Sequence, residues 1–165
     1  MTSDNIFSEE QKYQLLRNIV EHMELDIEDE KDFLQGISGE ISNIKNNQLV
    51  LAEYEAVNCS NNVFCQIYEK YEAERKRYHK LDFDDMLVLT YELFKKRPDI
   101  LKLWQNKFKY ILIDEFQDIN KVQYDVIRML AAPENNLFIV GDDDQSIYRF
   151  RGARPDIMLG FKHDY

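Results

Sequence analysis

Apolar residues recur at helical spacing through the first half of the chain. Ser8 and Gln11 form a capping-box pattern, and apolar positions three and four residues apart follow it. Two further stretches repeat this spacing, the second of them after a polar break at residues 58–62. The three apolar stripes consist of Leu15, Leu16, Ile19, Val20 and Met23, then Phe33, Leu34, Ile37, Ile41 and Ile44, and then Val63, Phe64, Ile67, Tyr68 and Tyr71. We expect an all-helical unit over residues 1–80.

The pattern changes at Leu81. Asp82 is a good N-cap for a helix over residues 83–97, which has acidic residues in its first turn and basic residues in its last. Pro98 is expected to end that helix. The short runs "YILI" (residues 110–113) and "LFIV" (residues 137–140) are wholly apolar and bounded by polar turns, as is typical of strands buried on both faces.

Between these two runs, Asn120 with Gln123 three residues later predicts a capped helix that ends near Leu130. A strand, a helix and a strand in this order predict a parallel pair, with a ligand site beyond the carboxyl ends of the strands. The fold class is therefore α/β, with a mostly helical N-terminal half and a partial parallel sheet.

Composition narrows the possible functions. The 165 residues are 44% hydrophobic, which indicates a folded chain. A formal net charge of -10 argues against binding nucleic acid through an overall positive field, although a local basic and aromatic patch is compatible with it. No apolar run approaches the roughly 20 residues that span a bilayer. Cys59 and Cys65 have no metal-ligand spacing, so we expect reduced cysteines and a cytoplasmic protein.

Acidic residues follow both predicted strands. Asp114 and Glu115 follow the first, and "GDDDQSIYRFRGA" (residues 141–153) follows the second. In nucleotide hydrolysis an aspartate at such an edge holds Mg²⁺, a neighbouring carboxylate takes a proton from water, and a polar side chain such as Gln145 senses the terminal phosphate. The same acidic residues could equally be solvated turn or N-cap residues, and "DDD" could be a helix start or a weak calcium site.

Three segments resemble the UvrD/Rep/PcrA helicases of superfamily 1. "ILIDEFQDIN" is similar to their Walker B motif, motif II, and "VGDDDQSIYRFRGA" to their motif III. "LDFDDML" (residues 81–87) resembles the segment that re-enters the first RecA-like domain after its helical insertion. The resemblance implies a helical insertion subdomain over residues 1–80 and the C-terminal part of a RecA-like (P-loop NTPase) domain over residues 81–165.

The resemblance also implies roles for single residues. Asp114 would coordinate Mg²⁺, Glu115 would be the general base for ATP hydrolysis, and Gln145 would contact the γ-phosphate and couple it to DNA. Tyr148 and Phe150 would lie on the path of single-stranded DNA, where a base can stack on an aromatic ring. Arg151 would pair with a phosphate or with a neighbouring acidic residue. Without the resemblance, both aromatic residues are read as core packing.

One motif of that family is missing from the sequence. None of the five glycines belongs to G-x-x-x-x-G-K-[ST], the loop whose amides cradle phosphates. We therefore expect a fragment that neither hydrolyses ATP nor unwinds DNA by itself. Its two apolar strands would have open edges, so we also expect the chain to self-associate.

The implied parent activity is that of an ATP-dependent DNA helicase or translocase, which moves 3′ to 5′ on single-stranded DNA and unwinds duplex DNA. One alternative is the motor part of an AddA/RecB-like helicase-nuclease. Another is a non-enzymatic DNA-binding or docking module that lacks the phosphate loop by nature. A third is a metal-dependent phosphohydrolase that uses Asp114, Glu115 and the acidic residues 142–144.

Overall fold

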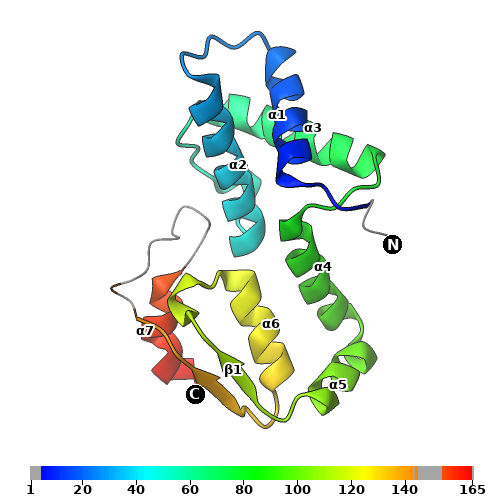
Figure 1. Ribbon diagram of the computed structural model, residues 1–165, viewed down its shortest axis with the longest axis vertical. Helices are drawn as coiled ribbons and strands as arrows, with labels where there is room; N and C mark the ends of the chain where they lie inside the picture. The colour runs from blue at the N-terminus through cyan, green and yellow to red at the C-terminus, as the bar shows by residue number, and fades with distance from the viewer. Residues whose placement is uncertain (1–4, 143, 145–153, 165) are drawn as a thin grey trace. The chain divides into compact units, whose positions relative to one another are not determined.

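The computed structural model describes residues 5–142, 144 and 154–164, and within this part of the chain it shows two compact units (Figure 1). Unit 1 comprises residues up to Lys45 and from Leu49 to Met86, and unit 2 comprises Asn46–Gln48 and the residues from Leu87 onward. The predicted boundary between residues 80 and 81 stays a prediction. None of the helices in the described residues is long and apolar enough to cross a membrane.

Unit 1 is helical, as predicted. It contains α1 (Glu9–Glu21), α2 (Glu30–Asn47, except its last two residues), η2 (Leu51–Glu53), α3 (Asn61–Arg77) and the first turn of α4 (Phe83–Lys96). The predicted capping box at Ser8 and Gln11 is present, with both reciprocal hydrogen bonds at 3.2 Å. The three predicted apolar stripes supply the core, because their most buried members form one cluster. These are Leu16, Ile19, Val20, Leu34, Ile37, Ile41, Ile44, Phe64, Ile67 and Tyr71.

A cluster of five charged side chains lies beside this apolar core, with four of them buried and Glu72 half-buried. Lys45 Nζ donates to Asp82 at 2.6 Å and to Asp85 at 3.0 Å, and it lies 2.9 Å from Glu72. Arg75 pairs with Glu72 at 2.7 Å and with Asp85 at 2.9 Å. Each of these charges therefore has a partner of opposite sign at hydrogen-bonding distance, which is what allows it to be buried.

The cluster shifts the pKa of both aspartates. Burial alone would raise the pKa of Asp82, but Lys45 holds it down, from 3.8 to about 2. Burial raises the pKa of Asp85 above its ordinary value, and the neighbouring Asp82 adds to this rise. The two residues also form a reciprocal cap at the start of α4, because Asp85 N donates to Asp82 at 2.7 Å and Asp82 N donates to Asp85 at 3.0 Å. The prediction of Asp82 as an N-cap is confirmed.

Unit 2 contains the rest of α4, then α5 (Pro98–Lys107), β1 (Ile111–Ile113), η3 (Phe116–Asp118), α6 (Lys121–Ala131), β2 (Leu137–Ile139) and α7 (Pro155–Asp164). The strands pair in parallel with Leu112 opposite Phe138, as the order of strand, helix and strand predicts. Asn120 and Gln123 form the predicted capping box of α6. Pro98 follows the end of α4 as predicted, but it also starts α5, where its fixed φ suits the first helical position.

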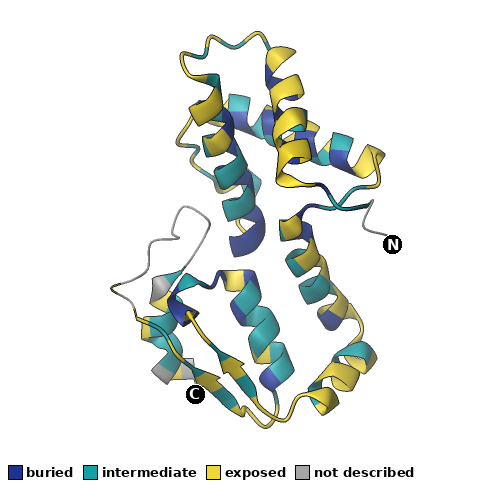
Figure 2. Ribbon diagram, viewed as in Figure 1, coloured by how far each residue is buried: buried dark blue, intermediate teal, exposed yellow. Residues whose placement is uncertain are grey.

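The prediction that both strands are buried on two faces is wrong for the described residues. Ile113 and Ile139 pack against the buried cluster of Phe116, Ile119 and Tyr124, and side chains of α7 pack against the same cluster, so one face of the sheet is covered. On the other face Leu112 is 72% exposed and Phe138 61% exposed, which Figure 2 shows as yellow segments in the middle of each strand. The alternation of side chains along a strand explains this result, because helices of the described residues cover only one side.

Candidate nucleotide-hydrolysis site

The loops that follow β1 and β2 meet at one edge of the sheet. Val140 N donates to Ile113 O at 2.8 Å, and Phe116 N donates back to Val140 O at 2.9 Å. The backbone bonding therefore continues at Val140, one residue past β2, and reaches Phe116, three residues past β1, which brings the two acidic loops together. This convergence is what the order of the strands predicted.

Asp114 and Glu115 stand side by side at this edge, and both are exposed. Glu115 has φ 52° and ψ 41°, which is the left-handed region, and its backbone N–H donates to Asp114 Oδ1 at 3.0 Å. A residue with a Cβ loses about 1–2 kcal/mol in this conformation relative to the right-handed one. Strain of this kind gathers at functional positions, where it is maintained by the surrounding structure.

Gln117 hydrogen-bonds to both loops through its side-chain amide. Its side chain is almost fully buried, with 1% exposed; its Nε2 donates to Glu115 Oε2 at 2.6 Å, and its Oε1 accepts from Asp142 N at 3.0 Å. Gly141 allows this approach, because a Cβ at that position would lie 2.5 Å from Gln117 Oε1 and 3.1 Å from Phe116 N. These two bonds hold the Glu115 side chain and the backbone after β2 on the same amide.

A cluster of aromatic side chains packs against the loop that follows β1. The Phe116 side chain is fully buried and contacts Tyr124 of α6 and Phe161 of α7 edge to face, with ring centroids 6.0 Å and 5.5 Å away. Arg154 N donates to Ile119 O at 2.9 Å, which joins the start of α7 to the same loop. The segment that follows the two exposed carboxylates is therefore packed against α6 and α7.

The two exposed carboxylates are suited to a magnesium ion that arrives bound to the phosphates of a nucleotide. Among the described residues neither Asp114 nor Glu115 has an ion-pair partner, and no group of three or more acidic, histidine or cysteine side chains is placed to hold a metal. Mg²⁺ is commonly held by only one or two carboxylates, with water and phosphate oxygens completing its shell. An exposed pair suits this mode of binding better than a dedicated protein cage.

The other predicted site residues divide into two groups. Asp142 and Asp144 lie in the loop after β2, where Asp144 N donates to Asp142 Oδ1 at 3.0 Å. Gln145, Tyr148, Phe150 and Arg151 lie outside the described residues, so the roles given to them stay predictions. Sequence reasoning missed the close approach of Gly141, for which a glycine directly after a strand and before an acidic run was the available signal.

Comparison with known proteins agrees with these features. The model of the UvrD/REP helicase N-terminal domain matches residues 2–165. A putative ATP-dependent DNA helicase YjcD of Bacillus subtilis (strain 168) is 58% identical over 100 residues, which are 61% of this chain and 13% of that protein.

Two relatives are ATP-dependent DNA helicases PcrA. That of Leuconostoc citreum is 44% identical over 131 residues, 78% of this chain and 18% of the relative. That of Staphylococcus aureus (strain Mu50 / ATCC 700699) is 43% identical over 129 residues, 77% of this chain and 18% of the relative. The chain spans less than a fifth of the length of these relatives. It belongs to the UvrD/REP helicase N-terminal domain family.

Proposed function

We propose that the chain is part of the motor of an ATP-dependent DNA helicase or translocase that moves 3′ to 5′ on single-stranded DNA and unwinds duplex DNA. The observation that carries the proposal is the edge where Asp114 and Glu115 stand exposed and Gln117 orients the second of them. The names of the relatives, which are ATP-dependent DNA helicases, support ATP as the nucleotide and DNA as the nucleic acid substrate. We also infer that the protein works in the cytoplasm.

In this proposal Glu115 is the general base. Its Oε2 accepts from Gln117, which fixes the side chain, and its exposed carboxylate takes the proton from the attacking water. Asp114 would hold Mg²⁺, which when bound neutralises charge on the phosphate oxygens. Gln145 would contact the γ-phosphate, and Tyr148, Phe150 and Arg151 would contact single-stranded DNA, as the resemblance implies.

The test measures ATP hydrolysis with Mg²⁺, with and without single-stranded DNA. It compares this chain with the complete natural protein that carries it, each with Glu115→Gln and with the control Glu53→Gln, which changes an exposed glutamate in η2 of unit 1. We expect turnover by the complete protein and by its control variant, but not by the short chain, which lacks the phosphate loop.

Loss of a general base typically slows hydrolysis by about 10²–10⁴-fold. Binding of a fluorescent ATP analogue to the complete protein should survive Glu115→Gln, because the base acts on water and not on the phosphates. Equal turnover of the Glu115→Gln and Glu53→Gln proteins would disprove the assignment of the base. Hydrolysis by the short chain would disprove the account of the phosphate site.

A further inference from the structure

Basic residues are concentrated in one segment of an acidic chain. Residues 95–109 contain six lysine or arginine residues and a single acidic residue, Asp99, whereas the whole chain has 21 basic and 31 acidic residues. Two of the six are already paired on the surface, since Lys96 lies 2.8 Å from Glu92 and Arg97 lies 2.7 Å from Asp99. The later part of the segment, which covers the end of α5 and the approach to β1, therefore offers a local positive field on a protein of net charge -10.

Aromatic rings alternate with the lysines in this later part. Trp104 and Phe108 stack with ring centroids 6.0 Å apart and an angle of 17° between the ring planes. Lys107 Nζ lies 4.8 Å from the centroid of Trp104 and 5.9 Å from that of Phe108. Both rings are 42% exposed, and Tyr110 is 72% exposed. We call Lys102, Trp104, Lys107, Phe108, Lys109 and Tyr110 the basic aromatic patch.

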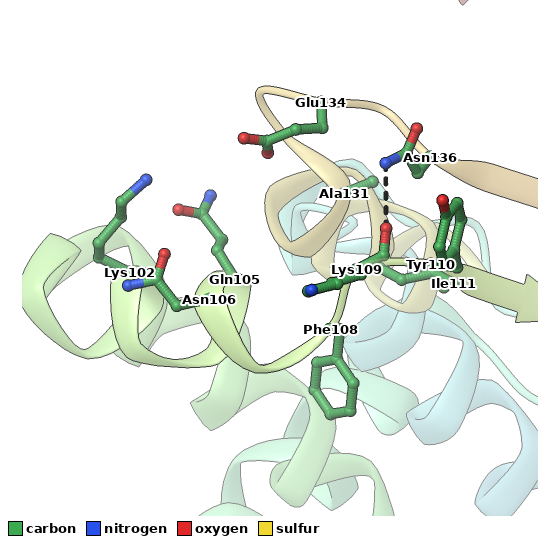
Figure 3. Close-up of a pocket in the computed structure, with 10 residues that line it drawn as sticks. All are labelled: Lys102, Gln105, Asn106, Phe108, Lys109, Tyr110, Ile111, Ala131, Glu134 and Asn136. Atoms are coloured by element: carbon green, nitrogen blue, oxygen red, sulfur yellow. Dashed lines mark hydrogen bonds between the residues drawn. The ribbon is translucent and has the colours of Figure 1, made fainter.

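A cavity of about 290 Å³ adjoins this patch (Figure 3). Of the patch residues, Lys102, Phe108, Lys109 and Tyr110 line it, whereas Trp104 and Lys107 do not, and the Phe108 ring points away from the side chains of Lys102 and Asn106. Lys102, Gln105 and Asn106 of α5 line one side, and Glu134 and Asn136 from the loop between α6 and β2 line the other. Figure 3 shows the side chains of Lys102, Gln105 and Asn106 projecting from α5. The walls are held by hydrogen bonds, because Gln105 Nε2 donates to Met129 O at 2.8 Å and Asn136 Nδ2 donates to Lys109 O at 3.0 Å.

The chemistry of the patch suits single-stranded nucleic acid. Proteins that bind single strands combine a positive groove for the phosphates with exposed aromatic rings on which bases stack. The patch supplies lysines at positions 102, 107 and 109 and the stacked pair of Trp104 and Phe108. An acidic peptide would use the lysines but would leave the flat ring pair without a matching partner.

We propose that the basic aromatic patch is a second binding site for single-stranded nucleic acid, separate from the strand contacts predicted at residues 148–151. The patch precedes β1 and the carboxylates follow it, so the three residues of β1 separate them by about 10 Å of backbone. The proposal rests on the proposed function only for the identity of the natural strand. It uses no residue of the hydrolysis site.

The test measures binding of a fluorescent oligothymidylate of about 16 nucleotides, a length at the upper end of single-domain site sizes. Trp104→Ala should weaken binding by roughly 5-fold to 100-fold, the loss expected when one stacked base is released. The matched control is Tyr78→Ala, because Tyr78 is 52% exposed and lies under Arg77 at 5.2 Å, but belongs to unit 1. Trp104→Phe keeps a ring and should restore most of the affinity, which separates stacking from a folding defect.

The lysines are tested through salt dependence. The triple variant Lys102→Gln, Lys107→Gln and Lys109→Gln should lower the slope of log affinity against log salt by about 2, since each phosphate contact on a single strand contributes about 0.7. The control triple variant Lys31→Gln, Lys70→Gln and Lys76→Gln removes the same charge from exposed positions of unit 1 and should leave the slope unchanged.

Three results would overturn the proposal. One is an absence of oligothymidylate binding by the chain. Another is an equal loss of affinity in the patch variants and their controls. The third is equal competition by polyglutamate together with no effect of Trp104→Ala, which would identify the patch as a docking site for an acidic protein. Glu115→Gln should bind oligothymidylate like the parent chain, so failure here is distinct from failure of the proposed ATP hydrolysis.

Discussion

Replacing Lys45 with methionine removes the central cation of the buried charge cluster while keeping a side chain of similar length. Lys45 is 6% exposed in its side chain and contacts Asp82, Asp85 and Glu72 at 2.6 to 3.0 Å. In Lys45→Met, Glu72 and Asp85 keep their ion pairs with Arg75, whereas Asp82 loses the one cation that the described residues place within hydrogen-bonding distance of it. Breaking a buried ion pair from one side costs about 3–5 kcal/mol, because the remaining charge stays buried without its partner.

Such a loss is a large part of the total stability of a domain, which is about 5–15 kcal/mol. The assay is urea denaturation at neutral pH followed by far-UV circular dichroism and, separately, by the fluorescence of Trp104, the single tryptophan, which lies in unit 2. Because Lys45 belongs to unit 1, the circular dichroism transition should move to lower urea by more than the fluorescence transition does.

The control is Lys76→Met. Lys76 lies 3.6 Å from Glu72, but its side chain is 70% exposed, so this pair is worth only about 0–1 kcal/mol. Asp82→Asn added to Lys45→Met should recover part of the lost stability, since it removes the carboxylate that has lost its cation. Equal losses of stability in Lys45→Met and Lys76→Met would refute the argument that burial of the cluster is what makes the loss of Lys45 destabilising.

The dependence on pH gives a second test of the same cluster. Asp82 has its pKa lowered from 3.8 to about 2 in the folded state, so its stabilising contribution is complete above about pH 4 and is lost as the pH falls toward about 2. In Lys45→Met the sign reverses, because carboxylates without their cation bind protons more tightly when folded than when unfolded. The variant should therefore gain more stability than the unsubstituted chain when the pH is lowered from about 7 to about 5, since in the unsubstituted cluster Asp85 alone has a raised pKa whereas the pKa values of Asp82 and Glu72 are lowered.

Three further predictions concern unit 2. Gly141→Ala should destabilise the chain by about 1–3 kcal/mol in urea denaturation, because the added Cβ would press on Gln117 Oε1. Gly160→Ala is the control, and it should be neutral or stabilising in the same assay because the space around Gly160 is open. Glu115→Gly should be about 1 kcal/mol more stable than Glu115→Ala in the same assay, because glycine adopts the left-handed backbone without strain, and equal stabilities would argue against strain at this position. We also expect the chain to self-associate through its sheet, whose strands have open edges, and Leu112→Lys should lower the extent of association measured by light scattering. A monodisperse unsubstituted chain at high concentration would contradict this expectation.

The features that sequence predicted are those set by local chemistry. The caps at Ser8, Asp82 and Asn120 each depend on a partner three residues away, and all three are present. The parallel pairing follows from two short apolar runs on either side of a helix. The position of Asp114 and Glu115 at the carboxyl edge follows from the pairing. These predictions needed no knowledge of which distant side chains meet.

The features that sequence missed depend on distant contacts. Lys45 reads as an ordinary lysine near the end of a helix, and only the folded chain brings it to Asp82 and Asp85, 37 and 40 residues away. The left-handed backbone of Glu115 has no sequence signal, because glutamate rarely adopts it. The exposure of Leu112 could not be predicted from an apolar run, which shows that a strand exists but not which of its faces the described residues cover.

The carboxamide of Gln117 has a direction, since one end can only donate and the other can only accept. The carboxylate of Glu115 needs a donor, and the N–H of Asp142 needs an acceptor, so the amide fits in one orientation alone. Glutamate at this position would place an acceptor, in place of the donor, against the Glu115 carboxylate, and asparagine would be one methylene shorter than the span between the two partners. The flat amide therefore links the orientation of the Glu115 side chain to the backbone that follows β2. The position of the Asp142 backbone is therefore linked to the Glu115 carboxylate through this one amide.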